Sequence, residues 1–160
     1  DTVACLKIVH EQKRRIVYEP RAQVFHHRRD MFRGHLKQLN RYARHRGFFA
    51  KRFPRTSLRP SYFAPTALLV WVCLGWILGL FGDAWSRFWA GSLVLYLCLA
   101  ALEAARMTAR APHGRRGVQL WGWVAAGLVA THLSYGWNLV VGLCSPRMSE
   151  ERSAMAGVSA

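Results

Sequence analysis

The sequence predicts a chain of two unlike parts, a basic α/β segment with an amphipathic helix and then three transmembrane α-helices. The first observation is the distribution of charge. Residues 1–60 carry 16 basic and four acidic side chains, net +12, whereas residues 61–160 carry a net charge of only +3. The second observation is that this weakly charged part contains three long uncharged runs, each near the length that crosses a bilayer.

Composition excludes several classes of protein. A hydrophobic content of 52% is too high for a disordered basic tail. Cys73, Cys98 and Cys144 lie in or at the ends of apolar runs, and Cys5 is alone in the polar part, so the four cysteines do not form a disulfide scaffold. A soluble helix bundle is the alternative, but three such runs would overfill the core of so small a domain.

The three runs predict spans at about residues 64–81, 84–105 and 118–144. The first has 18 uncharged residues and would be about 27 Å long as a helix. Glu103 lies near the end of the second span, three residues before Arg106, where a local ion pair is expected. The third run is long enough to tilt.

Two polar residues, His132 and Asn138, interrupt the third run. Hydrogen bonding between helices is the expected reason for polar groups in such a stretch. Contact with a lipid acceptor is the alternative.

The flanking charges predict the orientation. Cations precede the first span and join the second span to the third, whereas the connection between the first and second spans carries only Asp83 and Arg87. By the positive-inside rule, the basic N-terminal half lies in the cytoplasm and the C-terminus outside. The multi-pass region would cover residues 61–146, followed by a flexible tail at 147–160.

Residues 1–30 have a mixed pattern. Residues 2–14 predict a helix, and residues 15–18 and 22–26 predict two short strands separated by a turn at Pro20. Two short strands and one helix cannot hold a core alone. We therefore expect these residues to complete a domain whose earlier part precedes Asp1.

Residues 31–60 are expected to form a basic interface helix and a linker. Over residues 31–49, helical spacing places Phe32, Leu36, Leu39 and Ala43 on one side and several cations on another. Such a helix suits an anionic membrane surface. Gln38, Arg41 and Tyr42 share a flank of this helix, and periodicity alone favours a solvated face with a boundary tyrosine.

The order of several short motifs resembles the C-terminal part of bacterial family 2 glycosyltransferases, membrane-attached inverting enzymes with a GT-A fold. These motifs are Asp1-Thr2, IVYEP at 16–20, VFHHRR at 24–29 and QLNRY at 38–42. The segment THLSYG at 131–136 also resembles a recurring element of these enzymes. Tyr42 stands where processive synthases usually have Trp.

The resemblance implies roles for four residues in a sugar transfer with inversion. Asp1 would be the general base that takes the proton from the acceptor hydroxyl; an N-terminal helix cap is the alternative role. Arg41 would bind the leaving nucleoside diphosphate, since the guanidinium fork suits phosphate oxygens. Gln38 would be its hydrogen-bond partner and Tyr42 a platform for the sugar or acceptor.

The resemblance also implies partners in a bacterial plasma membrane. These are a nucleotide-sugar donor, a lipid or polysaccharide acceptor and anionic membrane lipid. Mg²⁺ or Mn²⁺ is expected on an Asp-x-Asp loop, which this sequence lacks, so its ligands would lie mostly outside the chain and the fragment alone would be inactive. His26 and His27 would point to opposite faces of a strand, which disfavours joint chelation.

Two other functions compete with this interpretation. The chain could be a non-enzymatic membrane protein whose basic helix binds anionic lipid or a protein partner. Nucleic-acid binding through the basic half is the weakest of the three hypotheses. Basic residues beside a membrane span are already explained by attraction to anionic lipid, and no nucleic-acid-binding motif is present.

Overall fold

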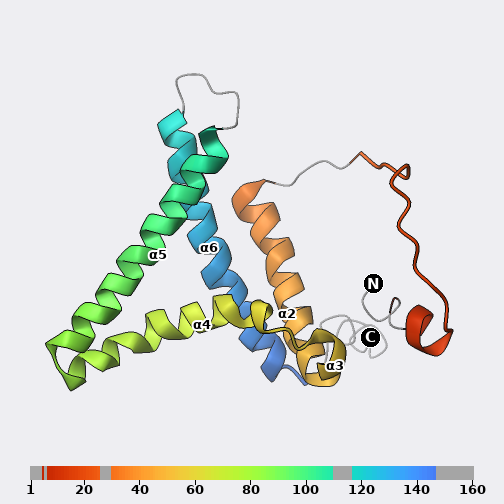
Figure 1. The fold of residues 1–160 in the computed structure, drawn as a ribbon, viewed down its shortest axis with the longest axis horizontal. Helices are drawn as coiled ribbons and strands as arrows, with labels where there is room; N and C mark the ends of the chain where they lie inside the picture. The colour runs from red at the N-terminus through yellow and green to blue at the C-terminus, as the bar shows by residue number, and fades with distance from the viewer. Residues whose placement is uncertain (1–4, 6, 26–29, 110–116, 147–160) are drawn as a thin grey trace, which may run out of the picture.

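A computed structural model describes residue 5 and residues 7–25, 30–109 and 117–146, and most of these residues are helical (Figure 1). The elements follow in chain order: η1 (Lys7–Glu11), η2 (Met31–His35), α2 (Leu36–Arg52), α3 (Pro54–Ser57), α4 (Pro60–Leu74), η3 (Gly75–Phe81), α5 (Asp83–Ala109) and α6 (Gly117–Cys144). Here η1 and η2 are π-helical turns and η3 is a 3₁₀ helix.

The predicted α/β part is not formed in the described residues, so this part of the prediction is corrected. Of the helix expected at 2–14, residues 2–4 and 6 lie outside the described residues, and η1 ends at Glu11; residues 15–18 and 22–25 are irregular and exposed rather than strands. A strand needs a partner backbone, and the described part of the chain supplies none. Val17, Tyr18 and Phe25 consequently remain more than four-fifths exposed. The last residue of the second predicted strand, His26, lies outside the described ranges.

The three predicted apolar helices are confirmed. Pro60–Phe81, Asp83–Ala109 and Gly117–Cys144 are each long and apolar enough to cross a membrane. The first helix begins four residues earlier than predicted because it starts at Pro60. Proline is favoured there because a backbone N–H in the first turn has no acceptor within the helix. Large apolar side chains on these helices point outward, as a lipid environment requires; they include Val70, Leu80, Phe88, Leu95, Leu102 and Trp137.

The first two apolar helices form a hairpin. The chain reverses at Gly82, whose φ of 119° is a left-handed conformation that favours glycine. The indole N–H of Trp71 donates to the hydroxyl of Ser92 (2.8 Å), and that of Trp89 donates to the carbonyl of Trp71 (3.0 Å). These bonds hold the two helices together about three helical turns from Gly82.

Away from the turn, the hairpin opens and α6 closes the gap (Figure 1). The indole of Trp121 donates to the carbonyl of Ala101 on α5 (2.9 Å), and the hydroxyl of Thr66 on α4 donates to the carbonyl of Gly136 (3.2 Å). Trp121 and Gly136 are about four turns, or roughly 22 Å, apart along α6. The three helices therefore form the sides of a triangle.

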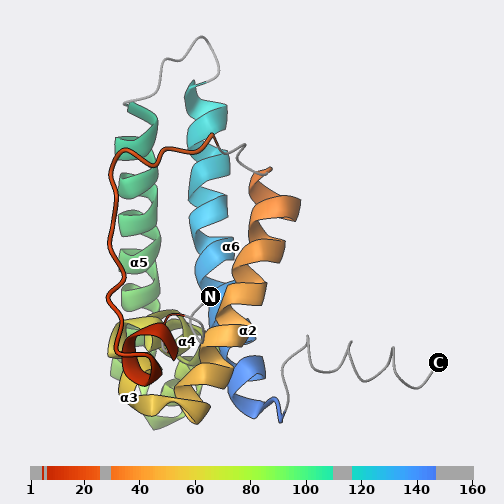
Figure 2. The ribbon, with the colours of Figure 1, turned by 90° about the vertical axis from the view of Figure 1, so that its right-hand side faces the viewer.

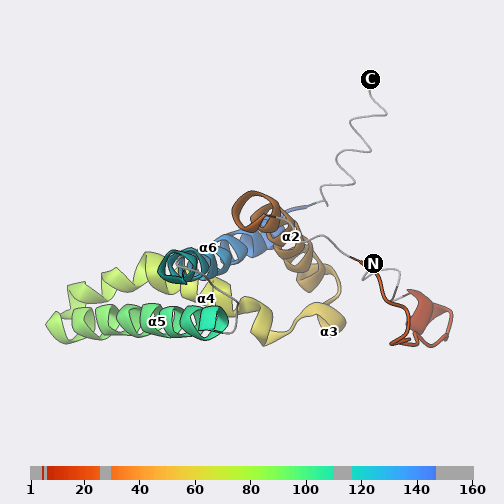
Figure 3. The same ribbon diagram turned by 90° about the horizontal axis from the view of Figure 1, so that it is seen from above.

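Helix α2 lies alongside α6, as two perpendicular views agree (Figures 1 and 2). Seen from above, α6 lies between α2 and the α4–α5 hairpin (Figure 3). The buried core is formed where α2, α4 and α6 meet; it contains Ala43, Tyr135 and Leu139, with Leu39, Tyr62, Phe63 and Leu143 packed around them.

Candidate functional site on helix α2

Three of the four predicted site residues lie on α2. The side-chain amide of Gln38 donates to the hydroxyl of Tyr42, one turn further along (3.1 Å). Arg41 and Tyr42 are exposed, with 55% of the Tyr42 surface accessible. The fourth predicted residue, Asp1, lies outside the described residues, so its predicted meeting with Arg41 stays a prediction.

The predicted site residues lie on the side of α2 that is turned away from α6. Leu39, Ala43 and Gly47 face α6 and are buried or half-buried. At 100° per residue, Gln38 and Arg41 lie more than a quarter turn from this buried side. A ligand arriving from outside the helix pair can therefore reach them.

The predicted apolar face of α2 exists, and a helix covers it. Ala43 is completely buried against α6 together with Tyr135 and Leu139. Before the helix begins, the ring of Phe32 contacts the ring of Trp123 edge-on, with centroids 5.5 Å apart. The apolar face that the sequence predicted to contact a membrane surface thus packs against α6.

Two glycines bring the backbones of α2 and α6 into direct contact. A Cβ atom added at Gly47 would collide with the carbonyl of Leu139, and one added at Gly142 would collide with the carbonyl of Arg44. Small residues at such positions allow close packing of helices. The separation of α2 and α6 therefore depends on Gly47 and Gly142 having no side chain.

A row of hydrogen bonds, here called the polar seam, runs beside this contact through Asn40, Arg44, Ser134 and Asn138. The hydroxyl of Ser134 donates to Asn40 Oδ1 (2.6 Å), and Arg44 Nε donates to Asn138 Oδ1 (2.6 Å). The amide nitrogen of Asn138 donates to the carbonyl of Ser134 (2.8 Å). Both ends of the Asn138 amide are thus satisfied, although the residue is only 4% exposed.

Two further cations of α2 bind the other helices. Arg46 donates to the hydroxyl of Tyr135 (3.1 Å), and its guanidinium lies 4.2 Å from the ring centroid of Tyr62. Lys51 Nζ donates to the carbonyls of Leu143 and Ser145 (2.9 and 2.8 Å) at the end of α6. A cation at a helix C-terminus pairs with carbonyls that have no partner within the helix.

The exposed cations of α2 determine where this helix can lie. Each Lys or Arg costs about 2.5–3.5 kcal/mol at the centre of a bilayer on the insertion scale. The exposed ones are Lys37, Arg41, Arg44, Arg46, Lys51 and Arg52. Cations at six positions make α2 poorly suited to hydrocarbon.

Two local predictions for the apolar helices are confirmed. The hydroxyl of Tyr96 on α5 lies 2.9 Å from His132 Nδ1 on α6, so His132 makes the expected bond between helices, as Asn138 does in the polar seam. Glu103 and Arg106 form the expected ion pair, at 3.8 Å. Both ion-pair partners are more than half exposed, so this pair contributes little to stability.

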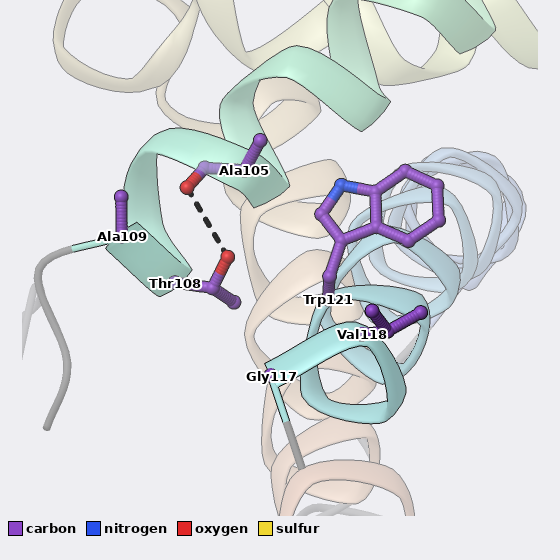
Figure 4. Close-up of a pocket in the computed structure, with 6 residues that line it drawn as sticks. All are labelled: Ala105, Thr108, Ala109, Gly117, Val118 and Trp121. Carbon is purple, nitrogen blue, oxygen red and sulfur yellow. Dashed lines mark hydrogen bonds between the residues drawn. The ribbon is translucent and has the colours of Figure 1, made fainter. Parts of the chain in front are cut away.

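A groove of about 600 Å³ lies between the end of α5 and the start of α6 (Figure 4). Its lining residues are Ala105, Thr108, Ala109, Gly117, Val118 and Trp121. The hydroxyl of Thr108 donates back to the carbonyls of Ala104 and Ala105 (2.8 and 3.1 Å). The lining is apolar apart from the Thr108 hydroxyl, which is bonded to its own helix, and none of the six lining residues is an acid or a base.

The expected metal finds no site in the described ranges. Among residues 5, 7–25, 30–109 and 117–146, no three His, Cys, Asp or Glu side chains group closely enough to hold an ion. The described residues therefore do not fit a Mg²⁺ or Mn²⁺ centre.

Among the residues that hold α2 in place, the sequence pointed to Asn138, a polar residue in an apolar run. Arg44 was one of several cations on the polar side of a predicted helix, and Gly47 and Gly142 gave no signal. The segment 131–136 was a second indication, since Ser134, Tyr135 and Gly136 all contact α2 or α4.

Comparisons with models of protein families, with curated proteins and with solved structures found no match to this chain.

Proposed function

We propose that this chain is the C-terminal, membrane-attached part of an inverting glycosyltransferase of bacterial family 2. The enzyme would move a sugar from a nucleotide donor to a lipid or polysaccharide acceptor at the cytoplasmic face of the plasma membrane. The motif resemblance at Asp1, residues 16–20, 24–29 and 38–42 suggests this activity. The GT-A domain would then be completed by residues that precede Asp1.

The observation that best supports this proposal is the arrangement of the QLNRY motif. Gln38 and Tyr42 are joined by a hydrogen bond, and Arg41 is exposed on the outer side of α2. The opposite side of α2 is fixed to α6 by the glycine contact and the polar seam. A guanidinium on a helix held in this way is suited to bind a diphosphate with little ordering cost.

The proposed chemistry divides between two groups. Asp1 would take the proton of the acceptor hydroxyl as its oxygen attacks the anomeric carbon with inversion. Arg41 would stabilise the charge that develops on the leaving diphosphate. Donor recognition and metal binding would belong to the part of the enzyme outside this chain.

The coding sequence upstream of Asp1 provides a direct test. The proposal requires a Glu immediately before Asp1 and an Asp-x-Asp motif farther upstream. A start codon within a few residues of Asp1 would contradict it.

A kinetic test uses the longer protein that the proposal requires. We expect Arg41→Lys to lower kcat/KM for sugar transfer by about ten- to a hundredfold, because a single ammonium cannot replace the bidentate fork. Arg52→Lys is the matched control, since Arg52 is exposed on the same side of α2 in its last turn. Unchanged kcat/KM in Arg41→Lys would exclude Arg41 from the diphosphate-binding site.

The proposed general base is tested in the same longer protein. Asp1→Asn should abolish sugar transfer and leave membrane insertion intact.

A non-enzymatic role is the second candidate, favoured by the exposed cations of α2. A helix of this kind attracts anionic lipid, by about 1 kcal/mol for each cation near the surface. In this case vesicles with anionic lipid should bind the chain more tightly than neutral vesicles, and the longer protein should show no sugar transfer.

A further inference from the structure

We infer that α2 and α6 lie together along the cytoplasmic surface of the membrane, and that only the α4–α5 hairpin crosses it. The two surface helices are here called the platform, and the surface that they contact is the anionic inner leaflet. The C-terminus then lies in the cytoplasm, whereas the flanking charges alone predicted it outside. This inference concerns topology and does not depend on the proposed sugar transfer.

The first step is that the start of α4 and the end of α6 lie side by side. Lys51, nine residues before α4, binds the last carbonyls of α6, and Thr66 in α4 binds Gly136. In a chain that crosses the membrane three times, these two ends would lie on opposite faces, separated by about 30 Å of hydrocarbon. The observed contacts require them to lie on the same face.

The second step is that α6 lies at the same depth as α2. The two helices run in the same direction and touch from the Phe32–Trp123 contact to the Lys51–Ser145 contact (Figure 2). Any path that takes α6 through hydrocarbon takes the exposed cations of α2 with it. Both helices are therefore excluded from a transmembrane position.

The third step is that the hairpin can cross without α6. Pro60–Phe81 and Asp83–Ala109 would be about 33 and 40 Å long if fully helical, enough to cross with a tilt. Near the turn at Gly82, Trp76, Phe81 and Trp85 are exposed, as aromatic residues are at a membrane interface. The turn then marks the outer face.

The fourth step is the distribution of charge and aromatic residues around the platform. The turn of the hairpin carries only Asp83 and Arg87, whereas the cations of α2 lie at its open end. The platform also exposes Trp121, Trp123 and Trp137 at different points along α6. Indole rings at headgroup depth beside a cationic helix suit an anionic leaflet.

Labelling of the native Cys144, exposed at the end of α6, tests the side of the membrane. In the full chain with Cys5, Cys73 and Cys98 replaced by Ser, a membrane-impermeant maleimide should label Cys144 in inside-out vesicles and not in spheroplasts. In the control, Asp83→Cys with Cys144 replaced by Ser should be labelled in spheroplasts. Labelling of Cys144 in spheroplasts would overturn the inference.

Reporter fusions to the unsubstituted chain give an independent measurement. A C-terminal fluorescent protein that folds only in the cytoplasm should be bright, and a C-terminal alkaline phosphatase should be inactive. The reverse pattern would establish a third crossing.

Spin labels test the depth of α6. Ala126 and Leu97 are both exposed near the middle of an apolar helix, on α6 and α5 respectively. In vesicles with anionic lipid, a label at Ala126→Cys should be several-fold more accessible to a water-soluble nickel complex than one at Leu97→Cys. Equal, low accessibility at both positions would show that α6 crosses the bilayer.

Discussion

At the scale of single residues, Asn138 has the most demanding environment in the described chain. Its amide is almost fully buried, accepts from Arg44 and donates to the carbonyl of Ser134. A buried polar group that loses its partner costs about 1–3 kcal/mol, more than the bond contributes when it is made. Asn138 therefore ties α2 to α6 more tightly than an apolar residue of similar size would.

We expect Asn138→Leu to lower the free energy of unfolding in detergent micelles by about 1–3 kcal/mol, because Arg44 loses its acceptor. Gln119→Leu is the control, since Gln119 is exposed on the same helix and its replacement should change stability little. A double-mutant cycle with Arg44→Ala should give a coupling energy of about 0.5–3 kcal/mol. Strictly additive effects would show that the two side chains do not interact.

At the scale of elements, α6 is the helix around which the others pack. Gly142 and Gly47 join it to α2, Gly136 admits the start of α4, and His132 bonds to α5. Three different neighbours thus pack on one helix. This explains why α6 has more buried residues than α5, and more than α4, which is equally uncharged.

Substitution of a single glycine should detach α2. We expect Gly142→Leu to push α2 away from α6 and to speed tryptic cleavage at the Lys and Arg residues of α2. Gly122→Leu is a matched control on the same helix, since a Cβ there meets no atom within 4 Å. Equal cleavage rates in the two variants would contradict the observed backbone contact.

The contact between α5 and α6 can be tested at Tyr96. We expect Tyr96→Phe to destabilise the chain in micelles by about 0.6 kcal/mol and by no more than about 1.7 kcal/mol, the average and the maximum measured for hydrogen bonds between membrane helices. Cys98→Ser, at an exposed position two residues away, should have a smaller effect on thermal unfolding. Unchanged stability in Tyr96→Phe would show that the bond to His132 contributes nothing.

At the scale of the whole molecule, the chain separates charge from apolar surface. The exposed cations of the described helices gather on α2, and the exposed large apolar side chains gather on α4, η3, α5 and α6. So large an uncovered apolar surface on three long helices is consistent with a membrane protein.

Membrane insertion of the hairpin should depend on the depth of a substituted charge. We expect Leu97→Arg, at the middle of α5, to cost about 2.5–3.5 kcal/mol and to lower the inserted fraction. Met107→Arg should be tolerated, because an arginine near a helix end can extend to the headgroups. Glycosylation mapping measures both inserted fractions, and equal insertion would place position 97 outside the hydrocarbon.

The local features of the fold could be predicted from the sequence. The uncharged runs at 64–81, 84–105 and 118–144 predicted the three apolar helices, since hydrophobicity and length are properties of each segment alone. The spacing of Leu39 and Ala43 likewise predicted the side of α2 that is buried. The strands at 15–18 and 22–26 were predicted from an equally local pattern, but a strand also needs a neighbour, and the described residues offer none.

The sequence by itself determined that this protein has three helices fit for lipid and a basic amphipathic helix before them. Only the tertiary structure decided what the apolar face of that helix touches, and that Arg44 meets Asn138 across 94 positions of the chain. Hydrophobic periodicity predicts which side of a helix is buried, but not which other element packs against that side. The partner is selected by close fit, here between Gly47 and Gly142, which depends on the positions of two backbones together.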